Sequence, residues 1–330
     1  MPLYPHIQKK DTAMTKYVIK RLVLMVFTLF VITTICFILV KLLPLPAVKE
    51  MGRDVNIILA RREAMGYNKP ILVQYGIYLK HLFQGDFGLG EQMYAGREVF
   101  DIMMTKLPYS VVVNLYSILV AIPLALILGI YAALRKNRWQ DHVISTAVVL
   151  FISVPSYVYA FLVQYFLCFK AGLFPLTVAS RADADFFSWT MFRSMVPAIM
   201  SLAFGTIAGL TRFTRAELSE VLTGDYLLLA RTKGLTRSQA ITRHAMRNAM
   251  VPILPMILGE FVAILGGSLI IESIFAIPGI GSLYVTSINL RDYNFFMADT
   301  VLYTAIGLLA GLVTDLSYGF IDPRIKMGQR

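Results

Sequence analysis

Six long stretches of apolar residues run along the chain. Each is long enough to form a helix across the hydrocarbon core of a bilayer, which takes roughly 20 residues. The first follows a basic stretch, as a signal peptide does, but it is too long for one and lacks a small-residue cleavage site, so we expect a retained span. We expect spans over Leu22–Leu43, Pro108–Leu134, Val143–Phe169, Ser194–Leu210, Met250–Phe275 and Asp299–Phe320.

The composition agrees with this pattern. Of the 330 residues, 57% are hydrophobic and only 15% are charged, whereas a soluble globular protein has about 45–50% and about 25%. These values exclude a typical soluble enzyme and a disordered chain, and they predict an all-α polytopic membrane protein with six transmembrane helices. Cys36 and Cys168 lie inside apolar runs, and the four histidines have no metal-ligand spacing, so we expect no metal site.

The basic residues are unevenly distributed between the two sides of the predicted spans. Eighteen of the 31 Lys and Arg residues, with only six acidic residues, fall at the N-terminus, in or beside the loop 135–138, in the loop 211–249 and in the C-terminal tail. Cytoplasmic loops are rich in Lys and Arg. We therefore expect both termini in the cytoplasm, and the net charge of +11 then requires no nucleic-acid partner.

Small residues recur at every fourth position in several spans, which places them on one helix face. In the second span they are Ala121, Ala125, Gly129 and Ala133. Small faces let membrane helices approach closely, so we interpret this stripe as a packing face. Pro155 lies inside the third predicted span, where proline can kink a helix.

The long loop 211–249 contains three helical patterns. In its middle, Asp225 can cap a short helix over Tyr226–Lys233, and Gly234 can end it. This helix carries leucines beside Arg231 and Lys233 and is amphipathic. Its apolar side needs a partner, and the composition leaves open whether that is the lipid headgroup layer or a soluble protein. The flanking patterns predict helices over Thr214–Leu222 and Arg237–Asn248.

Residues 225–235 and 243–252, which contain Arg-His-Ala-Met-Arg-Asn-Ala, resemble the cytoplasmic EAA loop of ABC importer permeases, in the branch that imports peptides and nickel. The segments 272–281, 291–293 and 315–325 resemble later landmarks of that family. Residues 65–75 and 84–88 resemble the B-type subunit of oligopeptide and dipeptide permeases. The chain departs from the family pattern at 44–47 and 88–90, which leaves the substrate and the binding protein open.

The resemblance implies a type I ABC importer permease fold with a cytoplasmic coupling helix. The residues expected to contact the ATPase are Tyr226, Ala230, Arg231, Gly234 and Leu235. The expected partners are two ATP-binding subunits, a homologous second permease subunit of C type, an extracytoplasmic peptide-binding protein and the lipid bilayer. ATP would be bound by the partner subunits, so we expect this chain to have no cofactor. The expected location is the cell membrane of a prokaryote.

We divide the chain into three parts. Residues 1–106 hold the cytoplasmic N-terminus, the first span and an external helical segment; residues 107–320 form the permease domain with five spans; residues 321–330 form a cytoplasmic tail. The sequence has no Walker A motif, so we expect a non-catalytic pathway subunit of an ATP-driven peptide importer.

Two acidic residues are candidates for the translocation pathway. Glu260 lies near the middle of the fifth predicted span, where a charge is costly and often functional; its alternative is a hydrogen-bonded carboxyl between helices. Glu272 lies nearer the outer end, where it could instead anchor the following loop. Two other functions remain open: a permease for nickel or another small solute, and an ion-coupled secondary transporter with Glu260 as its coupling carboxyl.

Overall fold

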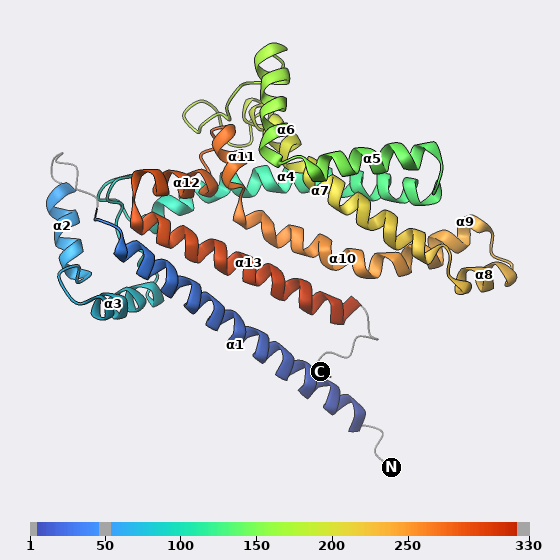
Figure 1. The fold of residues 1–330 in the computed structure, drawn as a ribbon, viewed down its shortest axis with the longest axis horizontal. Coiled ribbons are helices and arrows are strands. Elements are labelled where there is room, and N and C mark those ends of the chain that lie inside the picture. Colours follow the sequence, from blue (N-terminus) through green and yellow to red (C-terminus); the bar gives the residue numbers. More distant parts are fainter. Residues whose placement is uncertain (1–4, 46–53, 322–330) are drawn as a thin grey trace. The chain divides into compact units, whose positions relative to one another are not determined.

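The computed structural model describes residues 5–45 and 54–321, with side chains over 15–45 and 55–317 (Figure 1). The described residues form helices, turns and an isolated β-bridge between Leu89 and Glu98. The predicted tail lies outside the described residues except for Ile321, as does the part of the external segment over 46–53.

Within the described residues, five helices are long and apolar enough to cross a membrane, and a bent pair makes a sixth when its two arms are counted as one span. The expectation of an all-α polytopic membrane protein is confirmed. The five helices are α1 (Pro5–Leu42), α4 (Val99–Leu134), α7 (Trp189–Val221), the run from α9 to η3, and α13 (Tyr293–Ile321). The run consists of α9 (Arg237–Ala240), the π-helical η2 (Ile241–Ala245), α10 (Met246–Ala263) and η3 (Ile264–Gly266).

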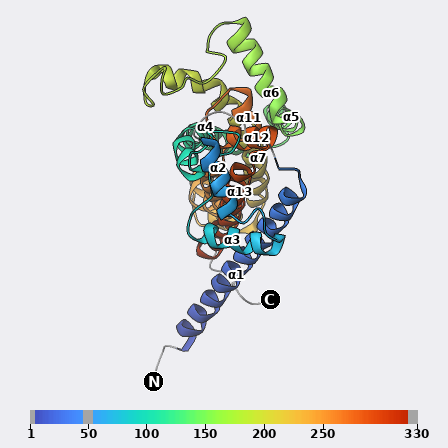
Figure 2. The same cartoon turned by 90° about the vertical axis from the view of Figure 1, so that its left-hand side faces the viewer.

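The third predicted span is not one straight helix. It consists of α5 (Trp139–Ser153) and α6 (Ser156–Val163) with its continuation η1 (Gln164–Lys170), and the two arms are bent by 102° (Figures 1 and 2). Val154 adopts an extended conformation with φ −88° and ψ 126°, because the ring of a following proline disfavours the helical region. Pro155 therefore breaks this span.

The fifth predicted span, Met250–Phe275, is wrong at both ends. The helix already begins at Arg237, so the predicted separate helix over 237–248 is part of it, and it ends at Gly266. Gly267 has a φ of +60° and stops it. Two shorter helices follow, α11 (Leu269–Ile274) and α12 (Ile280–Leu290).

Two other spans are longer than predicted. Helix α7 runs over 189–221 and absorbs the helix predicted at 214–222, while α13 begins at Tyr293 rather than at residue 299. Polar residues occur near the end of α7 and near the start of α13, so a hydropathy pattern places the boundaries of these helices too early or too late. The helices themselves continue through these polar residues because their backbone hydrogen bonds are still made.

The chain divides into two compact units. The first comprises Met1–Ile19, Val112–Ile264 and Leu309–Arg330. Within it, α7 packs against α5, α6 and α10. The small stripe of α4 is buried at Ala121, Ala125 and Ala133, and a Cβ added at Gly129 would lie 2.6 Å from the Cβ of Thr214. The stripe is therefore a packing face, as predicted.

The second unit comprises Lys20–Val111 and Leu265–Leu308. It includes α2 (Asp54–Ala64) and α3 (Ile71–Phe83), so the described part of the external segment is largely helical. Two clusters of buried side chains form its core: the first includes Val99, Met103, Leu283 and Phe295, and the second is Phe37, Val40, Tyr293 and Met297.

Candidate functional site

A short helix, α8 (Asp225–Thr232), lies between α7 and α9. Gly224 rather than Asp225 occupies its N-cap position, so the predicted start of the helix is wrong by one residue. The Tyr226 hydroxyl donates a hydrogen bond of 3.1 Å to the carbonyl oxygen of Val221. This bond holds Tyr226 back against the end of α7.

The inner face of α8 is anchored on the spans of the first unit. Ala230 is buried, and Leu227 packs against the cluster of Ala133, Leu218, Ala245 and Ala249. The four residues of this cluster belong to α4, α7, η2 and α10. Because packed interiors transmit displacement rather than absorb it, a push on α8 reaches three spans directly.

The outer face of α8 is apolar and uncovered. Leu228 and Leu229 are 63% and 56% exposed, and the Tyr226 ring is also exposed. Arg231 is exposed beside them and makes no ion pair within the described residues. An apolar face of this kind, flanked by a cation, is typical of a surface that another molecule covers.

A tight turn ends α8. Gly234 has a φ of +90°, a conformation that residues with a side chain rarely adopt. The backbone N–H of Leu235 donates to the carbonyl oxygen of Ala230 at 3.3 Å. Thr236 and Gln239 then cap α9 reciprocally. All five predicted coupling residues therefore lie in α8 and this turn, with Ala230 facing inward.

An ion pair that the sequence analysis did not single out lies in the same unit. Asp141 of α5 is buried and accepts hydrogen bonds from Nε of Arg215 in α7 and, at 2.7 Å, from Nη2. The backbone N–H of Asn137 donates to the same carboxylate at 2.9 Å. We call this the Asp141–Arg215 clasp. It joins the 135–138 loop and α5 to the last third of α7.

Glu260 lies six residues before the end of its span rather than near the middle. It is half-buried, and its carboxyl makes a side-chain hydrogen bond with Thr206 of α7. This geometry matches the alternative of a hydrogen-bonded carboxyl between helices.

Glu272 is fully buried outside the spans. Its carboxylate accepts backbone N–H groups of Ser268 at 3.2 Å and Ser282 at 3.1 Å, and it bonds to the Ser110 side chain. Ser110 Oγ in turn accepts the N–H of Ile280 at 2.9 Å. Burial raises the pKa of the Glu272 carboxyl, and these hydrogen bonds oppose the rise. The position is that of an anchor for the 275–282 turn.

A second buried carboxylate, Asp292, holds the turn after α3 in the same unit. It accepts the backbone N–H groups of Glu91, Gln92 and Met93 at 2.9, 2.8 and 2.9 Å. Glu91 is held by two hydrogen bonds from Arg62 of α2, at 3.2 and 2.6 Å. Asp292 belongs to the Arg-Asp-Tyr landmark of the sequence. Its partners are backbone N–H groups, which every residue but proline has, so the sequence does not indicate which residues it bonds.

Two family descriptions together match almost the whole chain. Residues 14–114 match the N-terminal part of the membrane component of binding-protein-dependent transport systems, and residues 125–327 match the "Binding-protein-dependent transport system inner membrane component". The chain belongs to this family. It is a multi-pass permease component of a binding-protein-dependent ABC importer, and the expected type I importer permease fold is confirmed.

Curated relatives of the permease extend over its full length. It is 37% identical to the dipeptide transport system permease protein DppB of Bacillus subtilis (strain 168), over 96% of this chain and 100% of that one. It is 35% identical to DppB of Lactococcus lactis subsp. cremoris (strain MG1363), over 95% and 100%. The glutathione transport system permease protein GsiC of Escherichia coli (strain K12) is 32% identical, over 95% and 99%. The resemblance to dipeptide and oligopeptide permeases is thereby confirmed.

Proposed function

We propose that this permease forms part of the membrane pathway of an ATP-driven peptide importer and that two separate ATP-binding subunits drive it through α8. The observation that carries the proposal is the two-sided character of α8: its inner face is anchored on three spans, and its outer leucines are exposed. The ATP-binding subunits, rather than lipid headgroups, are the partner that we assign to this outer face.

The permease itself transmits motion and performs no chemistry. When the partner subunits bind ATP and move together, they displace α8 through Tyr226, Leu228 and Arg231. Leu227 and Ala230 pass the displacement to the cluster shared by α4, α7 and α10. The Asp141–Arg215 clasp carries it on from α7 to α5. The spans then rock between inward-open and outward-open arrangements.

The proposed cargo is a short peptide. The relatives described above are named for dipeptide and glutathione transport, and glutathione is itself a peptide. A homologous second permease of C type would complete the pathway, an extracytoplasmic binding protein would deliver the peptide, and both termini would lie in the cytoplasm. Nickel or another small solute is the competing cargo.

The test is isolation of the permease from its native membrane in mild detergent, followed by identification of the subunits that remain bound. We expect the wild type to retain two ATP-binding subunits and a second permease. Leu228→Arg should lose the ATP-binding subunits and keep the second permease, because it places a charge on the exposed apolar face without disturbing the core. Gly234→Asp should act in the same way by distorting the turn.

The matched control is Ser238→Arg, which adds the same charge at an exposed position of α9. It should retain every subunit. Retention of the ATP-binding subunits by Leu228→Arg, or their absence from the wild type, would contradict the assignment of α8.

A further inference from the structure

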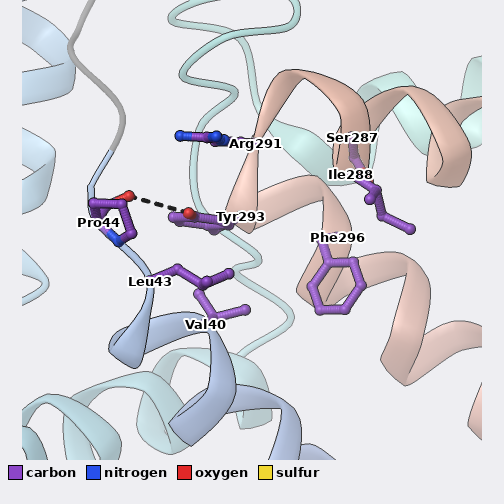
Figure 3. Close-up of a pocket in the computed structure, with 8 residues that line it drawn as sticks. All are labelled: Val40, Leu43, Pro44, Ser287, Ile288, Arg291, Tyr293 and Phe296. Carbon is purple, nitrogen blue, oxygen red and sulfur yellow. Dashed lines mark hydrogen bonds between the residues drawn. The ribbon is translucent and has the colours of Figure 1, made fainter.

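The end of α1 and the corner between α12 and α13 enclose a pocket of about 350 Å³ in the second unit. Figure 3 shows its lining: Val40, Leu43, Ile288 and Phe296 give an apolar wall, and Arg291 lies beside Tyr293. The Tyr293 hydroxyl donates to the carbonyl oxygen of Pro44 at 3.1 Å, which fixes the chain leaving α1 against the start of α13.

The pocket lies at the ends of two apolar helices. Helix α1 ends at Leu42 and α13 begins at Tyr293, so we infer that the boundary of the hydrocarbon layer lies near the pocket. Large apolar side chains around it are exposed: Leu42 by 73%, Leu43 by 52% and Ile288 by 50%. A pocket at this level is open to acyl chains on one side and to headgroups on the other.

Two cations flank the pocket. Arg291 caps α12 in the left-handed conformation, with a φ of 58°, and its guanidinium makes no ion pair within the described residues. Lys41 lines an adjoining pocket of about 210 Å³ that shares Val40, Leu43 and Tyr293. Among the described residues neither pocket is lined by a carboxylate. Lys41 lies over the Tyr67 ring and interacts with Glu91, so the cation that favours an anion in the pocket is Arg291.

We propose that this pocket binds an anionic phospholipid, with one acyl chain against Val40, Leu43 and Phe296 and the phosphate on Arg291. An apolar slot with cations at its rim has the two chemical features of such a lipid, and a guanidinium matches a phosphate with paired N–H donors. The pocket belongs to the second unit and α8 to the first, and the proposal does not depend on the identity of the cargo.

The test uses the full chain with the subunits that co-purify. After delipidation, it is offered equal amounts of dioleoyl phosphatidylglycerol and dioleoyl phosphatidylcholine, and the bound lipid is counted by native mass spectrometry. We expect phosphatidylglycerol to be retained about tenfold over phosphatidylcholine, which corresponds to about 1.4 kcal/mol. Arg291→Asn should abolish the preference without straining the backbone, because Asn tolerates the left-handed conformation; Arg291→Lys should restore part of it.

Two further variants locate the site. Ile288→Trp fills the apolar slot and should reduce retention of both lipids several-fold, whereas Arg181→Gln, which removes an exposed arginine from a loop of the first unit, should change nothing. Equal retention of the two lipids by the wild type would overturn the proposal. So would an unchanged preference in Arg291→Asn, unchanged retention in Ile288→Trp, or cross-linking from residue 288 to another subunit that excludes lipid.

Discussion

Two buried carboxylates of the second unit, those of Glu272 and Asp292, are held by backbone N–H groups rather than by cations. Glu272 accepts the N–H groups of Ser268 and Ser282 from its own neighbouring turns, whereas Asp292 accepts three N–H groups from the distant segment 91–93. Each N–H group left unsatisfied in a buried site costs about 1–3 kcal/mol. These two side chains therefore stabilise turns of the second unit. Because their carboxylate oxygens already accept backbone hydrogen bonds, they are poorly suited to bind a passing substrate.

Replacing Glu272 with Gln should destabilise the permease by about 1–3 kcal/mol. The amide replaces an accepting oxygen with an N–H donor, which then faces the backbone donors of Ser268 or Ser282. Thermal unfolding in detergent measures the loss. Glu63→Gln, at an exposed position of α2, serves as the control, and an equal melting temperature for Glu272→Gln and wild type would contradict the anchoring role.

Asp86 joins α2 to the end of α3. Its carboxylate is bonded to Arg61, to the N–H of Gly88 at 2.9 Å and to His81 Nδ1 at 2.8 Å. Burial raises the pKa of Asp86, but these hydrogen bonds outweigh it and hold the pKa below its ordinary value. A lowered carboxyl pKa stabilises the fold above the ordinary pKa of about 4, and the contribution is lost as the pH falls through the lower folded value.

Asp86→Asn should therefore lower stability by no more than about 1 kcal/mol at pH 7, since the ion pair is partly exposed. The difference from wild type should shrink only as the pH falls below about 4. Limited proteolysis of the α2–α3 segment at a series of pH values measures it. A difference that disappears already at pH 6 would assign the effect to another group.

At the scale of elements, the Asp141–Arg215 clasp and the inner face of α8 tie the helices of the first unit together at one end. The clasp combines a buried carboxylate with two hydrogen bonds from one guanidinium, a geometry that restrains direction as well as distance. The clasp therefore couples a movement of α7 to α5.

Replacing only one partner of the Asp141–Arg215 clasp should destabilise the fold more than replacing both. Arg215→Gln leaves Asp141 buried without its cation and should destabilise by about 2–4 kcal/mol, whereas Arg215→Gln combined with Asp141→Asn should recover part of that loss. A double-mutant cycle on thermal unfolding gives the coupling energy between the two side chains. Additive effects of the two substitutions would show that the clasp does not act as a unit.

The sequence predicts the helices better than the breaks within them and the contacts between them. It places α8 to within one residue, because a capping position, four apolar residues and Gly234 are all local signals. It indicates a possible kink at Pro155 but not a break of 102°, because residues 143–169 carry no charged side chain and are counted as one apolar run. It also misses the clasp, because nothing in the sequence relates Asp141 to an arginine 74 residues away.

For the whole molecule, apolar runs and the order of the family motifs predict a six-span importer permease, and the family match confirms this class. The roles of single residues are less predictable. Glu260 was expected near the middle of a span, but the helix ends at Gly266, and the Thr206 side chain already bonds its carboxyl. Where a helix stops depends on Gly267, which hydropathy does not weigh.

The most direct test of the account is uptake of a labelled dipeptide by proteoliposomes that contain the purified complex and its binding protein. We predict uptake that requires ATP on the side of the ATP-binding subunits, is unaffected by collapsing the proton or sodium gradient, and persists in Glu260→Gln. Uptake driven by an ion gradient without ATP and abolished by Glu260→Gln would contradict the account. ATP-driven uptake of nickel but not of dipeptide would contradict the assignment of the cargo.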